Sequence, residues 1–252
     1  MQSGPVRFAS IHPVDPTAGT WRMLATVDPQ AFRAPPPPGN HTSATQAELA
    51  ELRLMTQRRT AADVSQIRRW SLWERSVMAH WEALASEMAR RYNLGPPSAG
   101  RIHHALTTAV YAALISAWAT KYAHVRPRPS VLDPRIDTSV IPVPEHPAYP
   151  SGHSTAAGAA VTILSRFFPA DAALFEAVAQ DAGMSRLKAG IHYRSDHTRG
   201  LELGRQVARA VLEHMSAHDG APTAYLPRPN APRMTFPEAM ALLDCLGAIC
   251  HG

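Results

Sequence analysis

Apolar side chains recur every three or four residues along most of this chain, which is the spacing of one face of an α-helix. The segment 98–121 is apolar nearly all round, so it is expected to be a long helix at the centre of the molecule. Further helices are predicted over 44–56, 63–70, 71–92, 154–168, 170–182, 196–218 and 236–249. The alternating pattern of a β-strand is almost absent. These patterns predict an all-α fold built as a single helical bundle domain.

Proline-rich segments divide the chain. Residues 1–40 are predicted to form an N-terminal arm, in which the proline run 35–38 favours extended polyproline II and Trp21, Leu24 and Phe32 are candidate anchors. Residues 41–220 are predicted to be the helical domain, and 221–252 a second proline-rich segment with a C-terminal helix. Inside the domain, 126–150 carries seven prolines and no convincing helix. Loops of this length in compact domains are usually functional.

The composition favours an anionic small molecule as the partner. The chain has 25 lysine and arginine residues against 20 acidic ones, which gives a formal net charge of +5. A modest basic excess suits an anionic substrate. The arginines at 58, 59, 68 and 69 are expected on a solvated helix face, because the aromatic residues near them follow a burial period. Nucleic acid is therefore not predicted as a partner.

No segment of the chain reads as a leader or a membrane anchor. The N-terminus lacks the basic start and apolar run of a signal peptide. The longest apolar stretches, 105–120 and 154–168, are shorter than the roughly 20 apolar residues that span a bilayer. A soluble protein is expected, bacterial periplasmic or secreted if a signal peptide has been removed and cytoplasmic otherwise. Cys245 and Cys250 could form a local bridge or stay free, and no zinc-type cluster is predicted.

Three short blocks between 121 and 196 carry the residues of an oxyanion site. Arg128 and Arg186 offer planar guanidinium groups that suit two oxygens at once, and Lys121 offers a point charge. Ser151 offers a hydroxyl, and Gly152 allows the backbone N–H to come close to a ligand. Both lie at the start of a predicted helix, where free N–H groups and the helix dipole attract anions.

The same blocks contain two histidines and a carboxylate that suit group transfer. His192 and Asp196 are four residues apart, so the carboxylate can hold the imidazole in one tautomer and leave the other nitrogen free to attack. His153 lies in a different block and is the candidate general acid for the leaving group.

The blocks K-x6-R-P, P-S-G-H and S-R-x5-H-x3-D, in this order, resemble the signature of the type-2 phosphatidic acid phosphatase superfamily. This superfamily includes bacterial class A acid phosphatases, membrane lipid phosphatases and vanadium-dependent haloperoxidases. The matching fixed positions are Lys121, Arg128, Pro129, Pro150, Ser151, Gly152, His153, Ser185, Arg186, His192 and Asp196. The resemblance covers 98–218, and the phrases at 118–122 and 146–153 are most similar to the soluble, haloperoxidase-like bacterial branch. It implies a helical bundle of the acid phosphatase and vanadium haloperoxidase type.

The main functional prediction is a metal-independent phosphoric monoester hydrolase without a cofactor, in which His192 becomes a phosphohistidine. The alternative is a vanadium-dependent haloperoxidase, in which His192 coordinates vanadate and hydrogen peroxide oxidises bromide rather than chloride. His146 bears on the halide, because algal bromoperoxidases resemble this chain in having histidine there. A second alternative is a non-catalytic oxyanion-binding module. The expected partner is a small phosphate ester, phosphate or vanadate, and a homodimer is compatible with the sequence.

Overall fold

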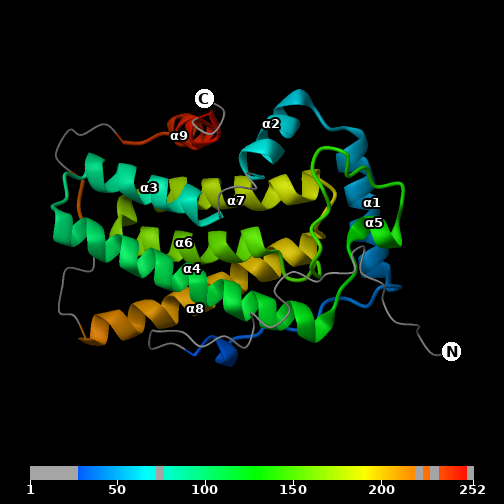
Figure 1. Cartoon of the computed structure of the whole chain (residues 1–252), viewed down its shortest axis with the longest axis horizontal. Coiled ribbons are helices and arrows are strands. Elements are labelled where there is room, and N and C mark those ends of the chain that lie inside the picture. The colour runs from blue at the N-terminus through cyan, green and yellow to red at the C-terminus, as the bar shows by residue number, and fades with distance from the viewer. Residues whose placement is uncertain (1–27, 72–76, 219–223, 228–232, 249–252) are drawn as a thin grey trace.

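The computed structural model describes residues 28–71, 77–218, 224–227 and 233–248, and within these ranges every regular element is a helix. The all-α prediction is confirmed. Figure 1 shows the long helices running side by side along the longest axis of the molecule. No helix in these ranges is both long and apolar enough to cross a membrane.

The centre of the bundle is α6 (Gly152–Phe167), which packs against α4 (Pro96–His124), α7 (Ala172–Lys188) and α8 (Arg194–His218). Small residues allow α6 and α8 to come very close. A Cβ atom on Gly204 would lie 2.0 Å from the carbonyl oxygen of Thr155, and one on Gly158 would lie 2.2 Å from that of Leu201. Glycines on both helices therefore set the close spacing of α6 and α8.

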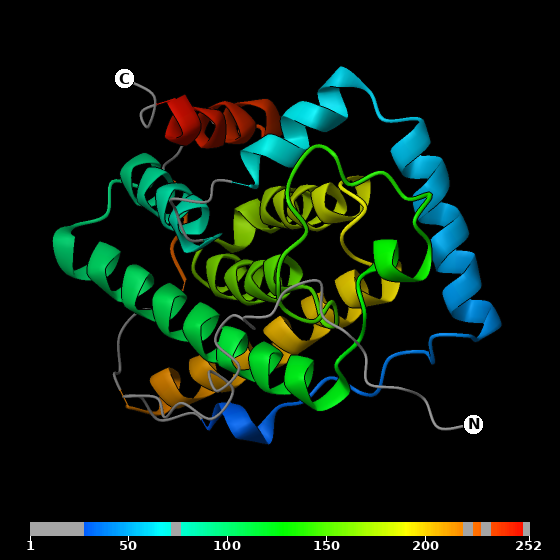
Figure 2. The same ribbon diagram turned by 45° about the vertical axis from the view of Figure 1, so that its right-hand side comes forward.

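Shorter helices cover this centre. Figure 2 shows α1 (Ser43–Gln57) beyond one end of the bundle, and α2 (Ala61–Arg69), α3 (Val77–Arg91) and α9 (Phe236–Ala248) along its sides. α3 buries Trp81, Leu84 and Met88 in the main core, as its helical spacing predicts. Cys245 is exposed on α9, and Cys250 lies outside the described residues.

The described part of the N-terminal segment runs along α4. It includes a 3-10 turn, η2 (Pro29–Ala31), whose Pro29 carbonyl accepts a hydrogen bond from Ser116 Oγ at 2.7 Å. Phe32 packs against the main core, whereas Trp21 and Leu24 lie outside the described residues. The division of the chain into arm, domain and C-terminal segment stays a prediction.

Several element boundaries differ from those expected. α7 continues to Lys188 and not 182, and it ends just before Gly190, whose φ is +75°. Gly183 inside this helix leaves room for His197 of α8, because a Cβ at 183 would lie 2.1 Å from Nδ1. α8 begins at Arg194, so Asp196 lies inside its first turn and does not cap it. The prediction that 126–150 contains no helix is wrong for one turn, α5 (Pro129–Leu132), whose first residue is a proline with the backbone geometry that a helix start requires.

Candidate active site

The three sequence blocks meet at one end of the bundle. There α4 and α7 end, α6 and α8 begin, and the 126–150 loop passes between them (Figure 1). The structure places these predicted residues together: Lys121, Arg128, His146, Ser151, Gly152, His153, Arg186, His192 and Asp196. Most of these side chains are buried, so their hydrogen bonds and charges act in a poorly solvated environment.

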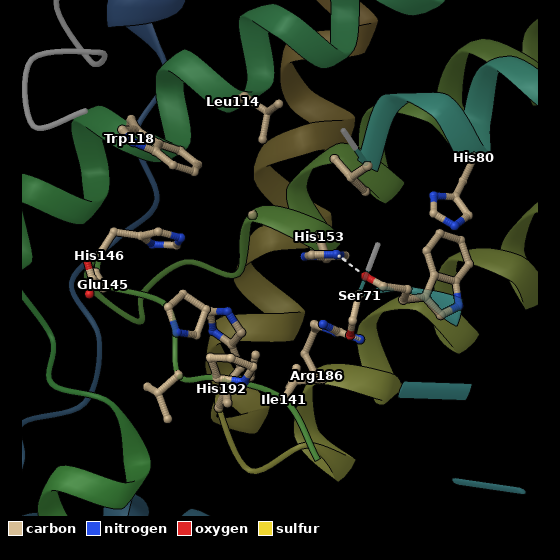
Figure 3. A pocket seen from close by; sticks show the side chains of 17 residues that line it. Ser71, His80, Leu114, Trp118, Ile141, Glu145, His146, His153, Arg186 and His192 are labelled. Atoms are coloured by element: carbon tan, nitrogen blue, oxygen red, sulfur yellow. Dashed lines mark hydrogen bonds between the residues drawn. The ribbon is translucent and has the colours of Figure 1, made fainter. Parts of the chain in front are cut away.

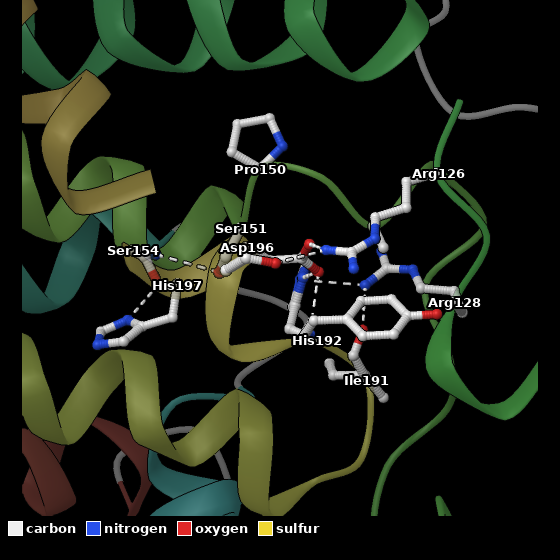
Figure 4. A network of polar contacts seen from close by, with 12 residues as sticks. Arg126, Arg128, Pro150, Ser151, Ser154, Ile191, His192, Asp196 and His197 are labelled. Atoms are coloured by element: carbon white, nitrogen blue, oxygen red, sulfur yellow. Dashed lines mark hydrogen bonds and ion pairs between the residues drawn. The ribbon is translucent and has the colours of Figure 1, made fainter. Parts of the chain in front are cut away.

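His192 is held in a single tautomer. Its Nδ1 lies 2.9 Å from Asp196 Oδ2, and its Nε2 lies 3.0 Å from Arg128 Nη1 (Figure 4). An arginine can only donate hydrogen bonds, so Nε2 is the acceptor and the ring proton resides on Nδ1. Burial and the positive charges of Arg128 and Lys121 lower the pKa of His192 well below its ordinary value. The result is a neutral imidazole whose unprotonated Nε2 accepts a hydrogen bond from Arg128.

Asp196 is supported from two further directions. The Tyr193 N–H donates to Oδ2 at 3.1 Å, and Arg126 Nη1 donates to Oδ1 at 2.8 Å. Arg126 also donates to Ser195 Oγ and, through Nη2, to Glu48 Oε2 at 2.9 Å. Burial raises the pKa of Asp196, while the charge of Arg126 opposes that rise. The ion pair with Arg126 therefore favours the carboxylate form that orients His192.

Arg128 links His192 to the loop. Its Nη1 donates to the carbonyl of Ile191 at 2.7 Å, and its Nε donates to the carbonyl of His146 at 3.1 Å. Burial lowers the pKa of Arg128 to about 10, so the guanidinium stays charged at neutral pH. The side chain is thus fixed beside the lone pair of His192, on the side where an oxyanion bonded to Nε2 would need a cation.

Lys121 is held by backbone carbonyls of the loop before α6. Its Nζ donates to the carbonyls of Pro147, Ala148 and Pro150, at 2.7, 3.1 and 2.5 Å. These three bonds use all the hydrogens of an ammonium group. Burial lowers the pKa of Lys121 well below its ordinary value. Lys121 therefore fixes the turn that leads into Ser151, and a direct bond from Lys121 to an oxyanion stays a prediction.

Ser151 and Gly152 form the start of α6. The Ser151 side chain caps the helix by accepting from Ser154 N at 3.3 Å, and its backbone N–H donates to the carbonyl of Asp196 at 3.0 Å. Gly152 lines the cavity at the first helical position, where backbone N–H groups have no partner within the helix. Their arrangement suits the anion-binding role predicted for them.

Arg186 and His153 lie on the other side of the site. Arg186 donates to Ser185 Oγ, to the carbonyl of Ile67 and to Ser71 Oγ, and burial lowers its pKa to about 9. His153 Nε2 lies 2.8 Å from the carbonyl of Trp70, so Nε2 carries the proton. Burial and the charge of Arg186 lower the pKa of His153 to about 3. A bound oxyanion would raise that pKa, because a nearby negative charge favours imidazolium.

His146 is part of the wall of the site. Its ring packs against Trp118 with the centroids 4.9 Å apart, and its Nδ1 lies 3.3 Å from Arg128 Nη2. Burial and the charges of Lys121 and Arg128 lower the pKa of His146 far below its ordinary value. It is therefore a neutral side chain placed directly beside Arg128.

A cavity of about 850 Å³ opens onto these residues (Figure 3). His146, Gly152, His153, Arg186 and His192 form its polar side. The remaining lining comes mainly from apolar residues of α3, α4 and the 141–144 segment, with Trp70 directly after α2. In the described part of the chain no group of three or more His, Cys, Asp or Glu side chains is arranged to hold a metal ion.

Comparisons with known proteins agree with this geometry. The structure is similar to that of a bacterial vanadium-dependent iodoperoxidase, with a TM-score of 0.70 and 25% identity over 80% of this chain and 57% of the other. A bacterial vanadium-dependent chloroperoxidase in its apo form gives a TM-score of 0.69 at 17% identity, over 82% of this chain and 57% of the other. A family model described as the VCPO second helical-bundle domain matches residues 172–220. These similarities support the resemblance of the three sequence blocks to the superfamily of vanadium haloperoxidases and type-2 phosphatidic acid phosphatases.

Two curated relatives lie within the haloperoxidase part of this superfamily. The vanadium-dependent bromoperoxidase of Corallina pilulifera is 35% identical over 100 residues, and that of Corallina officinalis is 32% identical over 117 residues. The matches cover 29% and 36% of this chain, but only 17% and 19% of the relatives. The shared stretch is thus a small part of those longer proteins.

Two residues of the site lie outside the superfamily motif, and sequence reasoning missed both. Arg126 stands two positions before Arg128. Its closeness to this motif residue was the only hint in the sequence that it belongs to the site. Glu48 lies on α1, far from the three blocks in sequence. Its Oε1 accepts from the backbone N–H of Ser195 in the first turn of α8. Only the packing of α1 against the start of α8 shows that Glu48 supports the site.

Protonation of His197, a buried histidine beside the site, is expected to destabilise the fold in acid. Its Nδ1 lies 2.9 Å from Ser154 Oγ, and burial with nearby Arg194 and Arg205 lowers its pKa from 6.5 to about 4. The unfolded chain binds the proton first, so stability present above pH 6.5 is lost as the pH falls towards 4. His197→Gln should remove about 2–3 kcal/mol of the fall in unfolding free energy between pH 7.5 and 4.5. Denaturant unfolding at both pH values measures this, and equal pH dependence in variant and wild type would refute it.

Proposed function

We propose that this protein is a vanadium-dependent haloperoxidase that oxidises bromide with hydrogen peroxide. The observation that carries the proposal is the neutral His192, whose Nε2 lone pair faces Arg128 inside a buried cluster of cations. The similarity to proteins titled vanadium-dependent iodoperoxidase and bromoperoxidase supports this choice over a phosphatase. The earlier main prediction, a phosphoric monoester hydrolase, thus becomes the second candidate.

The residues present fit vanadate by their chemistry. A tetrahedral oxyanion with several negative charges needs cations and one nitrogen donor, and the site supplies Arg128, Arg186 and Lys121 around His192. His192 Nε2 would hold the cofactor, and the Gly152 amide and Ser151 would lie beside its oxygens. Vanadate, when bound, supplies the Lewis-acid centre that activates peroxide for halide oxidation.

The remaining steps belong to the chain's own groups. Asp196 keeps the proton on Nδ1 of His192, so Nε2 stays unprotonated; a ligand on Nε2 would take the place of the hydrogen bond from Arg128. His153 would accept and return a proton at Nδ1, because its Nε2–H is committed to the carbonyl of Trp70. His146, neutral and next to Arg128, would contact the halide at the edge of the cage, as the likeness to algal bromoperoxidases at this position suggests.

A phosphoric monoester hydrolase is the second candidate. Phosphate has the same tetrahedral shape as vanadate and also binds to cations and hydrogen-bond donors. The Nε2 lone pair of His192 would then attack phosphorus, and His153 would protonate the leaving oxygen. No cofactor would take part in that reaction. A site that binds the oxyanion without turnover is the third reading.

Vanadate is expected to stabilise the protein and to confer bromide oxidation. At a vanadate concentration 100 times the dissociation constant, the unfolding free energy should rise by about 2.7 kcal/mol, which thermal denaturation detects. Oxidation of bromide by hydrogen peroxide should require added vanadate and follow its titration.

Hydrolysis of an aryl phosphate, assayed with a chelator and without vanadate, distinguishes the alternatives. Hydrolysis in the absence of bromide oxidation would replace the proposal with the phosphatase. Vanadate or phosphate stabilisation with neither activity would leave only the binding module.

A further inference from the structure

The turn that ends α2 (residues 66–71) supplies the hydrogen-bond acceptors for two residues of the site. The carbonyl of Trp70 accepts from His153 Nε2 at 2.8 Å, and the carbonyl of Ile67 accepts from Arg186 Nη2 at 2.7 Å. Ser71 Oγ accepts from the same arginine nitrogen at 2.9 Å, and Figure 3 shows Ser71, His153 and Arg186 close together. None of these acceptors belongs to the three sequence blocks. The orientation of two motif residues therefore depends on a segment outside the motif.

These acceptors are free because a helix ends here. The last four carbonyls of an α-helix have no partner within the helix, and α2 ends at Arg69. The carbonyls of Ile67 and Trp70 can thus bind side chains of other elements. α2 has 9 residues, and isolated helices shorter than about 12 residues are marginal in water. The position of these carbonyls must therefore be set by contacts with the rest of the fold.

Asp181 of α7 makes contacts that hold this turn. Its Oδ1 accepts from Gln66 Nε2 at 2.9 Å, and its Oδ2 accepts from the indole Nε1–H of Trp70 at 2.7 Å. Gln66 Nε2 also donates to the backbone carbonyl of Asp181 at 2.9 Å. Both donor side chains are buried, so water competes little for these bonds. Since Gln66 and Trp70 are four residues apart, one carboxylate holds both ends of a single helical turn.

The contacts of Asp181 suit positioning better than ion pairing. Arg69 Nη1 lies 3.5 Å from Oδ2, whereas Arg69 binds Asp244 of α9 at 2.6 and 3.0 Å. The short hydrogen bonds of Asp181 go instead to the neutral side chains of Gln66 and Trp70. Hydrogen bonds to an ionised acceptor are stronger than those between two neutral groups. The carboxylate therefore fixes where the turn lies.

We propose that Asp181 is a positioning residue of the reaction, which orients His153 and Arg186 by fixing the turn that ends α2 against α7. Asp181 and Arg186 lie on the same helix, so the carboxylate ties this turn to the element that carries the arginine. Asp181 is not among the residues that line the cavity, and its effect reaches the site through α2. The inference rests on the proposed function, in which His153 moves a proton and Arg186 binds the oxyanion.

The tautomer of His153 tests the positioning without any cofactor. The ring is neutral at neutral pH, because its pKa is lowered to about 3, and the Trp70 carbonyl keeps the proton on Nε2. Nitrogen NMR of isotope-labelled histidine rings, with His153 assigned by its absence in His153→Gln, should show this single tautomer in the wild type. Asp181→Asn replaces one acceptor oxygen by an amino group that faces a donor. In this variant the Nδ1–H tautomer of His153 should become detectable.

The matched control is Glu176→Gln, on the same helix. It removes a carboxylate whose partner is Arg205 of α8, at 2.7 Å. This variant should keep the wild-type His153 signal, vanadate affinity and turnover. Trp70→Phe removes the indole N–H that donates to Asp181, and it repeats the test if Asp181→Asn does not fold.

Turnover and vanadate binding measure what the orientation contributes. In Asp181→Asn, kcat for bromide oxidation should fall about 10–100-fold, which is the typical effect of losing a group that orients a functional residue. The dissociation constant for vanadate, measured by calorimetric titration, should rise as well, because Arg186 loses its fixed acceptors. Both measurements are made at a temperature at which the variant is folded.

The positioning role and the haloperoxidase function fail in different ways. A wild-type His153 tautomer in Asp181→Asn would overturn the positioning role, whatever the activity. A changed tautomer with wild-type kcat and vanadate affinity would also overturn it, because the orientation would then not serve the reaction. A wild-type protein that does not oxidise bromide would refute the haloperoxidase function, and the tautomer in Asp181→Asn would still decide whether Asp181 orients His153.

Discussion

His192→Ala is expected to abolish vanadate-dependent bromide oxidation, with a loss of at least about three orders of magnitude in kcat/KM. The substitution removes the unprotonated ring nitrogen beside Arg128 Nη1 on the imidazole that Asp196 orients. Vanadate should also no longer raise the melting temperature. If the protein is instead a phosphatase, the same change should abolish hydrolysis, because Nε2 would be the nucleophile.

Two further variants test whether the loss of activity in His192→Ala comes from the site itself. His104→Ala removes an exposed histidine of α4 and should leave turnover and vanadate stabilisation unchanged. Asp196→Asn keeps the shape of the carboxylate but can donate an N–H to Nδ1, which would move the ring proton to Nε2 and occupy its lone pair. Its activity should fall by roughly 10²–10⁴-fold even when vanadate still binds. Retention of most activity by His192→Ala would contradict the assignment of the site.

Arg126→Met is expected to destabilise the protein by about 3–5 kcal/mol, because it leaves Asp196 and Glu48 without their shared cation. Arg126 is 2% exposed and Asp196 is fully buried, so water cannot replace the lost partner. Burial alone would lower the pKa of Arg126, but Asp196 and Glu48 outweigh it and raise that pKa. For a chain of this size the melting temperature should fall by roughly 6–20 °C.

The effect of Arg126→Met on activity shows whether Arg126 helps to position Asp196 and His192 or only stabilises the fold. Without the guanidinium, the pKa of Asp196 should rise further, and protonation of Asp196 would remove its hold on His192 Nδ1. The acid side of the pH–activity profile should then shift to higher pH at a temperature where the variant is folded. Arg199→Met, which breaks an exposed ion pair with Glu202 on α8, should change stability by less than about 1 kcal/mol. An unchanged pH profile in Arg126→Met would mean that Arg126 only stabilises the fold.

The boundaries of the helices show how much of each helix could be predicted from the local sequence. The apolar periodicity of α4 identified a central helix, and the structure extends it only to Pro96–His124. α7 was expected to stop near 182, but it continues through Gly183 to Lys188. It ends just before Gly190, which has a φ of +75° and donates its N–H to the carbonyl of Leu187. Packing against His197 requires a glycine at 183, and the local signal that ends the helix is the glycine at 190.

The sequence by itself determined the helical class and the chemical inventory of the site, because helical periodicity and the spacing of functional residues are local properties of a chain. It could not show that Lys121 is bound by backbone carbonyls, or that Arg126 and Glu48 support Asp196. Nor could it show that an apolar surface faces the cage. These features join residues that are distant along the chain. Only tertiary packing brings such residues within hydrogen-bonding distance and removes the water that would otherwise weaken their interactions.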